Sequence, residues 1–374
     1  MAAETFNLSH EIAQKVIGRI AQANQQLRAL ENAASDEVAA LRTQKALIVS
    51  RKGRAIAEKP SLNIVGLFYD HISEAISNHF RMHGHNVKII EKAEDLEKET
   101  ELYDIFFTTS NYVLTQNNLS SAVNYTINCG KNGISCIWLW DHHHMFGTSL
   151  SISSYFDIVF PIHETSVDYL KTINTHVMNS LPAATYQFGS IHEMEEMYIK
   201  FGARQRSDSL YGGFREYPDM SRNFILRECI EKITENNLYL RPQNIINDKY
   251  YNLPTTEDRF AEWVNHKVSL SVSINTDIPI RIFDALSAGQ IPLVCSNING
   301  LDHIISVEDQ LRLPVIRFNY YDINEIRRAY EIALKQFDQG GREGAYKRHL
   351  YAMRNHTMVN RIARMIETLR LHFR

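Results

Sequence analysis

Short runs of strand-forming apolar residues alternate with helical stretches from residue 62 onwards, and this alternation constrains the fold more than any other feature. Helical spacing fills several of the gaps between strand-like runs, as in HISEAISNHFRMHGH at 71–85. Strands that alternate with helices predict a mostly parallel sheet covered by helices on both faces. Ligands of such sheets bind beyond the carboxyl ends of the strands. The first strand-like runs are LNIVGLFY (62–69), NVKII (86–90), YDIFFTT (103–109), ISCIWLW (134–140) and FDIVFPI (156–162).

A second alternating series follows residues 175–206, where Pro182 and Gly189 interrupt the pattern. The two series together predict two Rossmann-like domains, at residues 59–205 and 206–374. Long helical stretches at 322–337 and 356–373 end the chain. The second series itself consists of SLYGGF (209–214), SRNFILRECIEKITENN (221–237), LYLRP (238–242), TTEDRFAEWVNHK (255–267), VSLSVSI (268–274), RIFDALSAG (281–289), IPLVC (291–295) and PVIRF (314–318).

Residues 1–58 form a separate block with helical periodicity and no strand-like run. The spacing predicts an added N-terminal helical segment of one or two amphipathic helices. Such an apolar stripe packs against the main body or another subunit, so this segment is the candidate route to an oligomer. A membrane-surface helix would carry aromatic anchors that this segment lacks. The stripe consists of Ile12, Val16, Ile20, Leu27, Leu30, Val38 and Leu41.

Composition and missing motifs argue against several classes of protein. A net charge of -3 gives no basic field for nucleic acid. The first 20 residues lack a signal-peptide core, and no apolar run approaches the roughly 20 residues that span a bilayer. The four cysteines show no zinc or redox spacing. The P-loop, GxGxxG and GxSxG motifs do not occur. We therefore expect a cytoplasmic protein with no transmembrane segment and no nucleic-acid partner.

The segment 268–294 carries the densest set of candidate binding residues. A strand-like run ends near Ile274, and Arg281 and Asp284 then lie three residues apart at the start of a helix. Helix N–H groups and a guanidinium suit a pyrophosphate. A carboxylate suits a vicinal diol, because it accepts two hydrogen bonds. The alternative interpretation is a surface ion pair between Arg281 and Asp284.

This segment, with the sequence DIPIRIFDALSAGQIPLV, resembles the donor-site helix of GT-B glycosyltransferases, most closely that of the CgeB-like group. HTMVNRIARMIE (356–367) is similar to that group's His-Thr…Arg helix near the C-terminus. YGGF (211–214) with Arg222 resembles the opening of the C-terminal domain. The resemblance covers residues 209–370 by motif and 60–200 by architecture only. It implies a GT-B fold of two facing Rossmann-like domains, with C-terminal helices that cross back onto the N-terminal one.

The resemblance also implies an activity and a set of ligands. The chain would be a metal-independent glycosyltransferase whose cosubstrate is a nucleotide diphosphate sugar, with no further cofactor. The acceptor would carry a hydroxyl group, on a glycan, a lipid-linked sugar or a protein, and bacterial glycan biosynthesis or protein glycosylation is the expected context. Asp284 would bind the ribose hydroxyls, and Arg281 and Arg222 would lie near the diphosphate, beside Gly213.

The polar turn before the helix departs from the common retaining enzymes of this fold. Those enzymes carry an acid eight residues before the ribose-binding one, whereas this chain has Thr276 there, with Asp277 next to it. Both residues stay candidates for the donor site. The choice between retention and inversion stays open.

A second candidate site is IWLWDHHHMFG (137–147), where a strand-like run ends directly before Asp141. An acid or imidazole at the carboxyl end of a strand suits a general base for an acceptor hydroxyl. We take Asp141 as the first candidate, with His142 and His144 as alternatives that can share a face. A solvated polar loop and a metal site are the other interpretations of this cluster. PIHETS (161–166) follows the next strand, where His163 and Glu164 are fallback candidates and Glu164–Ser166 suits a helix start.

Two rival functions keep the same two-domain plan. A nucleotide-sugar epimerase or isomerase would need no acceptor site. A non-catalytic protein would bind the nucleotide sugar without reaction. Analysis of the products formed from the donor alone distinguishes the first rival. Calorimetry that shows nucleotide binding, with no hydrolysis or transfer of the donor, would favour the second.

The catalytic assignment of this acceptor loop yields a test. A positioned base contributes about 10²–10⁴-fold in rate. Asp141→Asn should therefore lower kcat by a factor in that range while nucleotide affinity stays nearly constant, because the donor residues belong to the other domain. Steady-state kinetics and nucleotide titration measure the two quantities. Near-normal turnover in Asp141→Asn, His142→Ala and His144→Ala alike would move the search to His163 and Glu164.

Overall fold

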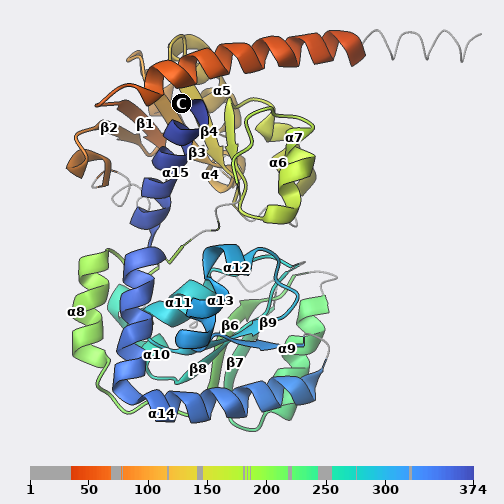
Figure 1. The fold of residues 1–374 in the computed structure, drawn as a ribbon, viewed down its shortest axis with the longest axis vertical. Helices are drawn as coiled ribbons and strands as arrows, with labels where there is room; N and C mark the ends of the chain where they lie inside the picture. Colours follow the sequence, from red (N-terminus) through yellow and green to blue (C-terminus); the bar gives the residue numbers. More distant parts are fainter. Residues whose placement is uncertain are drawn as a thin grey trace, which may run out of the picture. The chain divides into compact units, whose positions relative to one another are not determined.

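The computed structural model contains two five-stranded parallel sheets with helices packed against them (Figure 1). None of the helices that the structure describes is long and apolar enough to cross a membrane. Both sheets belong to one unit, Lys52–Arg374. The described residues are 35–68, 77, 79–115, 118–140, 146–179, 182, 184–185, 187–217, 221–242, 255–274, 276–319 and 322–374.

The first sheet has the strand order β2-β1-β3-β4-β5, and every neighbouring pair is parallel. Its strands confirm the five that the sequence predicts between residues 62 and 162. Every residue of β3, β4 and β5 is buried, as expected for parallel strands covered on both faces. The strands are β1 (Asn63–Leu67), β2 (Asn86–Ile90), β3 (Ile105–Thr109), β4 (Ile134–Trp138) and β5 (Ile158–Phe160).

Short helices connect the strands of the first sheet. A 3-10 turn at Glu164–Ser166 leads into α7, which confirms the helix start predicted after the fifth strand. Apolar side chains of the strands and these helices, among them Phe106, Tyr125 and Ile152, share one core. The helices are α3 (Ala93–Leu96), α4 (Ser110–Thr115), α5 (Leu119–Cys129), α6 (Phe146–Ser153) and α7 (Val167–Lys171).

The second sheet has the order β10-β9-β8-β6-β7, again with parallel neighbours. Its strands confirm the second predicted series. The strands are β6 (Leu210–Arg215), β7 (Asn236–Arg241), β8 (Val268–Ser271), β9 (Ile291–Cys295) and β10 (Ile316–Phe318). The helices between and before them are α8 (Ile191–Phe201), α9 (Ser221–Lys232), α10 (Thr256–Val264), α11 (Arg281–Ser287), α12 (Leu301–Ile304) and α13 (Val307–Arg312).

Two long helices close the chain, α14 (Ile323–Asn355) and α15 (Met358–Phe373). α14 packs against β8, β9, β10 and α11 and is broken at Gly341, whose φ of 54° and ψ of -148° are readily adopted only by glycine (Figure 1). α15 instead packs beside the first sheet. Its Arg370 donates to the Lys59 carbonyl, and His372 Nε2 lies 3.1 Å from His176 Nδ1. The C-terminal helix therefore crosses back, as the resemblance implies.

The N-terminal segment is helical where the structure describes it, from residue 35 to residue 57. This confirms a helix within the predicted segment, while residues 1–34 lie outside the described residues. Near its end, Gly53 lies so close to α15 that an added Cβ would come within 2.4 Å of the Phe373 ring. The end of this helix and α15 are thus packed too tightly for any side chain at position 53.

The close packing around Gly53 predicts that alanine in place of glycine destabilises the protein there, whereas the same substitution at Gly340 stabilises it. Gly53→Ala should lower the free energy of unfolding by about 1–3 kcal/mol, because the new methyl displaces the Phe373 ring. The matched control is Gly340→Ala on α14, where an added Cβ meets nothing within 4 Å. That change should stabilise the protein by up to about 1 kcal/mol through the unfolded state. Urea unfolding measures both, and equal midpoints for the two variants would contradict the contact.

Candidate functional site

Arg281 opens α11 at the carboxyl edge of the second sheet. Its Nε donates to the carbonyl of Gly213, at 2.8 Å, and its guanidinium carbon lies 4.8 Å from the centroid of the Phe214 ring. The side chain is half-buried. Arg281 is thus anchored at the end of β6, a strand far from it in sequence.

Arg222 comes to the same place from the first turn of α9. It is buried, and its Nη2 donates to the Arg215 carbonyl at 2.6 Å. Its guanidinium carbon lies 5.8 Å from the Phe214 ring centroid, so two cations contact the same ring. An added Cβ at Gly213 would meet nothing within 4 Å, which leaves open space beside the strand end. The structure therefore brings Gly213, Arg222 and Arg281 together near the end of β6.

Asp284 lies one turn further along α11 and is almost fully buried, with 1% of its surface exposed. Gln187 Nε2 donates to Oδ2 at 2.7 Å, and the Thr185 hydroxyl lies close by. Burial raises the pKa of Asp284 to about 7, although Thr185, the charge of Arg281 and Gln187 counteract part of the shift. The alternative interpretation of Arg281 and Asp284 as a surface ion pair is therefore wrong, because this carboxylate is not at the surface.

The linker between the two sheets, here the segment that contains Pro182, Thr185 and Gln187, meets the α14–α15 junction beside α11. The Thr185 N–H donates to the His356 carbonyl at 3.3 Å, and Arg361 Nε donates to the Pro182 carbonyl at 3.0 Å. The His356 ring stacks on the ring of Phe283, with centroids 4.9 Å apart, and the Arg361 guanidinium carbon lies 5.1 Å from the same ring. Phe283, the residue before Asp284 in α11, thus packs against two side chains of the α14–α15 junction, which the linker in turn contacts.

The turn before α11 is held by its own hydrogen bonds. The Asp277 carboxylate accepts from the Ile274 N–H, and Thr276, with a φ of 71°, accepts from the Asn299 N–H at 3.1 Å through its carbonyl. These contacts give Thr276 and Asp277 a structural role in the turn before α11.

The first turn of α11 is also satisfied internally. The N–H groups of Ile282, Phe283 and Asp284 donate to the carbonyls of Pro279 and Ile280. These three groups are therefore not the phosphate donors that a helix start suggests from sequence. A diphosphate at this edge would depend on the arginine side chains instead.

Two features of the site are absent from the sequence-based set of candidates. Gln187 and Thr185 contact Asp284 from an irregular linker that carries no periodic pattern. Phe214 was included only as the last residue of a weak YGGF motif, yet it is the ring that both arginines share. No local signal identifies Gln187, since its partner is 97 residues away along the chain.

The acceptor-side candidates Asp141, His142 and His144 lie outside the described residues. The residues directly before them, Leu139 and Trp140, follow β4 at the carboxyl edge of the first sheet. Trp140, which follows β4, donates its N–H to the Ser110 Oγ at 2.7 Å. His163, after β5, is buried. Among the described residues, no three His, Cys, Asp or Glu side chains are grouped to hold a metal ion.

Comparison with known proteins identifies the fold class. No protein-family model and no curated protein sequence matches the chain. Sucrose-phosphate synthase from Thermosynechococcus elongatus matches with a TM-score of 0.52 at 10% identity, over 83% of this chain and 99% of that one. An alpha-glucosyltransferase in complex with UDP-glucose and DNA containing an abasic site gives 0.53 at 9% identity, over 83% and 100%. A Thermobaculum terrenum O-GlcNAc transferase gives 0.50 at 10%, over 84% and 68%. These structural neighbours are GT-B glycosyltransferases, and the chain has the GT-B fold.

The raised pKa of Asp284 predicts a dependence of stability on pH. The folded pKa of about 7 exceeds the ordinary value of 3.8, so ionisation costs more in the folded state. The free energy of unfolding should therefore be highest below pH 4 and fall as the pH rises from about 4 through 7, by up to about 4 kcal/mol in total. Asp284→Asn should remove this part of the pH dependence.

Urea unfolding at pH 5 and pH 8 measures this effect. The control is Asp168→Asn, whose side chain is 94% exposed and which should keep the wild-type difference between the two pH values. The same difference in wild type and Asp284→Asn would show that the Asp284 carboxyl titrates near its ordinary value.

Proposed function

We propose that this protein is a glycosyltransferase that moves a sugar from a nucleotide diphosphate sugar to a hydroxyl acceptor. The observation that carries the proposal is the pair of guanidiniums, Arg222 and Arg281, around Phe214 at the carboxyl edge of a parallel sheet. Ligands of such sheets bind at this edge. One structure of the same fold is titled as a complex with UDP-glucose, which supports a donor of this class.

The two arginines suit the leaving group of such a reaction. Transfer of the sugar leaves a nucleoside diphosphate whose negative charge grows as the glycosidic bond breaks. Arg281 and Arg222 would donate hydrogen bonds to the phosphate oxygens, since guanidinium pairs with phosphate in a fork geometry. Fixed cations of this kind stabilise the transition state without rearranging. In this proposal they take the place of a metal ion.

Asp284 would contact the ribose through an exchange of hydrogen bonds. Its Oδ2 accepts from Gln187, so a ribose hydroxyl must replace that amide or use the second oxygen. The open space beside Gly213 leaves room for the nucleotide next to Arg281. Gln187 would then be the group that holds the carboxylate in place before the donor binds.

The acceptor side of the proposal depends on the loop after β4. Asp141 is the proposed general base, with His142 and His144 as alternatives, because the loop begins where the first sheet presents its carboxyl edge. The motifs of α11 and of residues 356–367 resemble those of the CgeB-like group of glycosyltransferases, and this resemblance supports a transferase of that kind. The acceptor would be a glycan, a lipid-linked sugar or a protein.

A nucleotide screen tests the donor site. Thermal unfolding is followed with UDP, GDP, CDP, ADP and dTDP, and a ligand at 100 times its Kd should stabilise the fold by about 2.7 kcal/mol. Arg281→Gln should weaken the best diphosphate roughly tenfold and the corresponding nucleoside far less. The control is Arg312→Gln on α13, whose arginine pairs with Asp309. Equal losses for diphosphate and nucleoside would assign Arg281 to the fold or the base.

Product analysis separates transfer from its rivals. Incubation with the matching nucleotide sugar alone should release free sugar slowly and leave the sugar configuration of the remaining donor unchanged. An epimerised donor would point to an isomerase. Tight donor binding with neither hydrolysis nor transfer to any hydroxyl acceptor would indicate a binding protein.

A further inference from the structure

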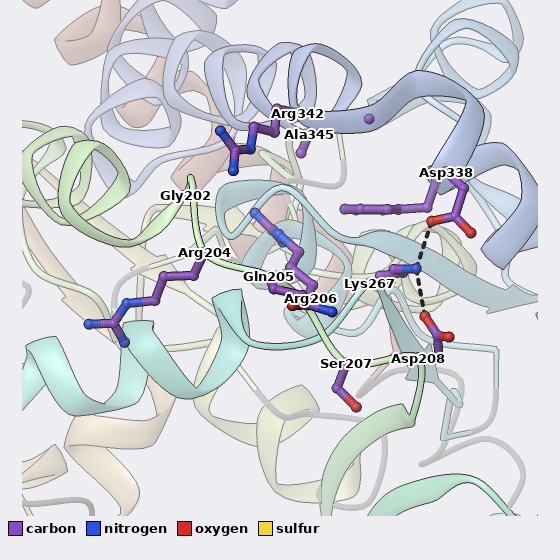
Figure 2. A pocket seen from close by; sticks show the side chains of 12 residues that line it. Gly202, Arg204, Gln205, Arg206, Ser207, Asp208, Lys267, Asp338, Arg342 and Ala345 are labelled. Carbon is purple, nitrogen blue, oxygen red and sulfur yellow. Dashed lines mark hydrogen bonds and ion pairs between the residues drawn. The ribbon is translucent and has the colours of Figure 1, made fainter.

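A cavity of about 420 Å³ lies at the amino edge of the second sheet (Figure 2). It is lined by Arg206 and Asp208, which precede β6, by Lys267, which immediately precedes β8, and by Asp338 and Arg342 of α14. The residues of the proposed donor site follow strands of the same sheet. The cavity therefore belongs to the opposite edge and is separate from that site.

The cavity has a surplus of positive charge. Lys267 Nζ lies 2.6 Å from carboxylate oxygens of both Asp208 and Asp338, so one cation engages both acids of the lining (Figure 2). Arg204, Arg206 and Arg342 also line the cavity. Within the described part of the chain, none of these three arginines is in an ion pair. The lining thus carries four cations against two carboxylates.

Arg206 is the central group, because it is buried beside the Tyr198 hydroxyl and has no carboxylate partner in the described chain. Only 7% of its surface is exposed, and its Nη1 donates to the carbonyls of Ala288, at 2.9 Å, and His266, at 3.3 Å. Its Nη2 is buried, and no acceptor among the described residues meets hydrogen-bond geometry with it. Its guanidinium carbon lies 5.4 Å from the Phe337 ring centroid.

A second buried cation lies behind it. Arg348 is 1% exposed, donates through Nε to the Gly289 carbonyl at 3.0 Å and lies 5.2 Å from the same Phe337 ring. Burial and the charge of Arg206 lower the pKa of Arg348 to about 9, and burial also lowers the pKa of Arg206. Two desolvated guanidiniums without a carboxylate partner in the described chain are costly, and an anion against Arg206 would offset that cost.

We propose that this cavity is a second ligand site, which binds the phosphate group of a small phosphate monoester or free phosphate. A phosphate monoester carries a charge of about -1.5 to -2 at pH 7, which matches the surplus of the lining better than a single carboxylate does. Its oxygens suit the forked donors of Arg206, with Arg204 and Arg342 at the rim. The volume is within the range of sites for small organic ligands, so the phosphate can carry a further group.

Both segments of α14 line this site. Phe337 and Asp338 reach the cavity from the segment before Gly341, whereas Arg342 and Ala345 reach it from the segment after it. A ligand in the cavity would therefore contact α14 on both sides of its break.

Titration calorimetry of the full chain with inorganic phosphate, and separately with a hexose 6-phosphate, tests this proposal at fixed ionic strength in a chloride buffer. We expect saturable binding of at least one probe, weakened roughly tenfold by Arg342→Gln, which removes an exposed cation of the rim. The matched control is Arg354→Gln, an exposed arginine of α14 outside the cavity, which should bind as wild type does. Tighter binding of the hexose phosphate would identify a phosphorylated metabolite, and equal or weaker binding would identify free phosphate.

The donor site needs its own control, because Arg222 and Arg281 could also attract phosphate. Binding here should be unchanged in Arg281→Gln and should persist at saturating nucleoside diphosphate. Arg206→Lys keeps the charge but loses the fork, and should weaken binding in a protein whose circular dichroism is unaltered. Failure of both probes to bind, equal affinity in Arg342→Gln and wild type, or complete competition by the nucleotide would each overturn the proposal. None of these results depends on whether the chain transfers a sugar.

Discussion

The contact on which the candidate site depends is the hydrogen bond between the Gln187 amide and the buried carboxylate of Asp284. Burying a carboxylate costs free energy unless polar groups donate hydrogen bonds to it, and Gln187 of the linker supplies such a bond. The same linker pairs with the α14–α15 junction through Thr185 and His356, and the junction clamps α11 through Phe283. The short helix α11 thus carries the donor-side candidates Arg281 and Asp284 and also contacts the linker and the α14–α15 junction, the two segments by which the chain passes between the sheets.

The second sheet carries two positively charged regions of different character. At its carboxyl edge, Arg222 and Arg281 donate to carbonyls of β6, and their guanidinium carbons lie 5.8 and 4.8 Å from the Phe214 ring centroid. At its amino edge, Arg206 and Arg348 are buried around Phe337, and Lys267 bridges two acids. In both places an aromatic ring replaces part of the solvation that a guanidinium loses on burial. Guanidiniums held in fixed positions beside aromatic rings can donate to the oxygens of an anion without rearranging.

Much of the architecture could be read from the sequence, and the reason is local. Strands such as β4 and β9 are buried on both faces, so they appear as uninterrupted apolar runs that stand out from their polar surroundings. The start of α11 was recognisable for the same reason, together with its resemblance to a known donor-site helix. The extent of α14 was not predicted, because the helical stretch expected at 322–337 continues to Asn355, across a break at Gly341.

The sequence by itself determined the two alternating series, the order of their strands along the chain and the placing of Arg281 and Asp284 at one helix start. Tertiary structure alone decided which groups these residues meet. Arg281 bonds to a carbonyl 68 residues away, and Asp284 to an amide 97 residues away. It also decided that Asp284 is buried and that Arg206 faces a cavity. Periodicity reports only neighbours within a few residues, whereas burial and hydrogen-bond partners depend on segments that meet only when both sheets are assembled.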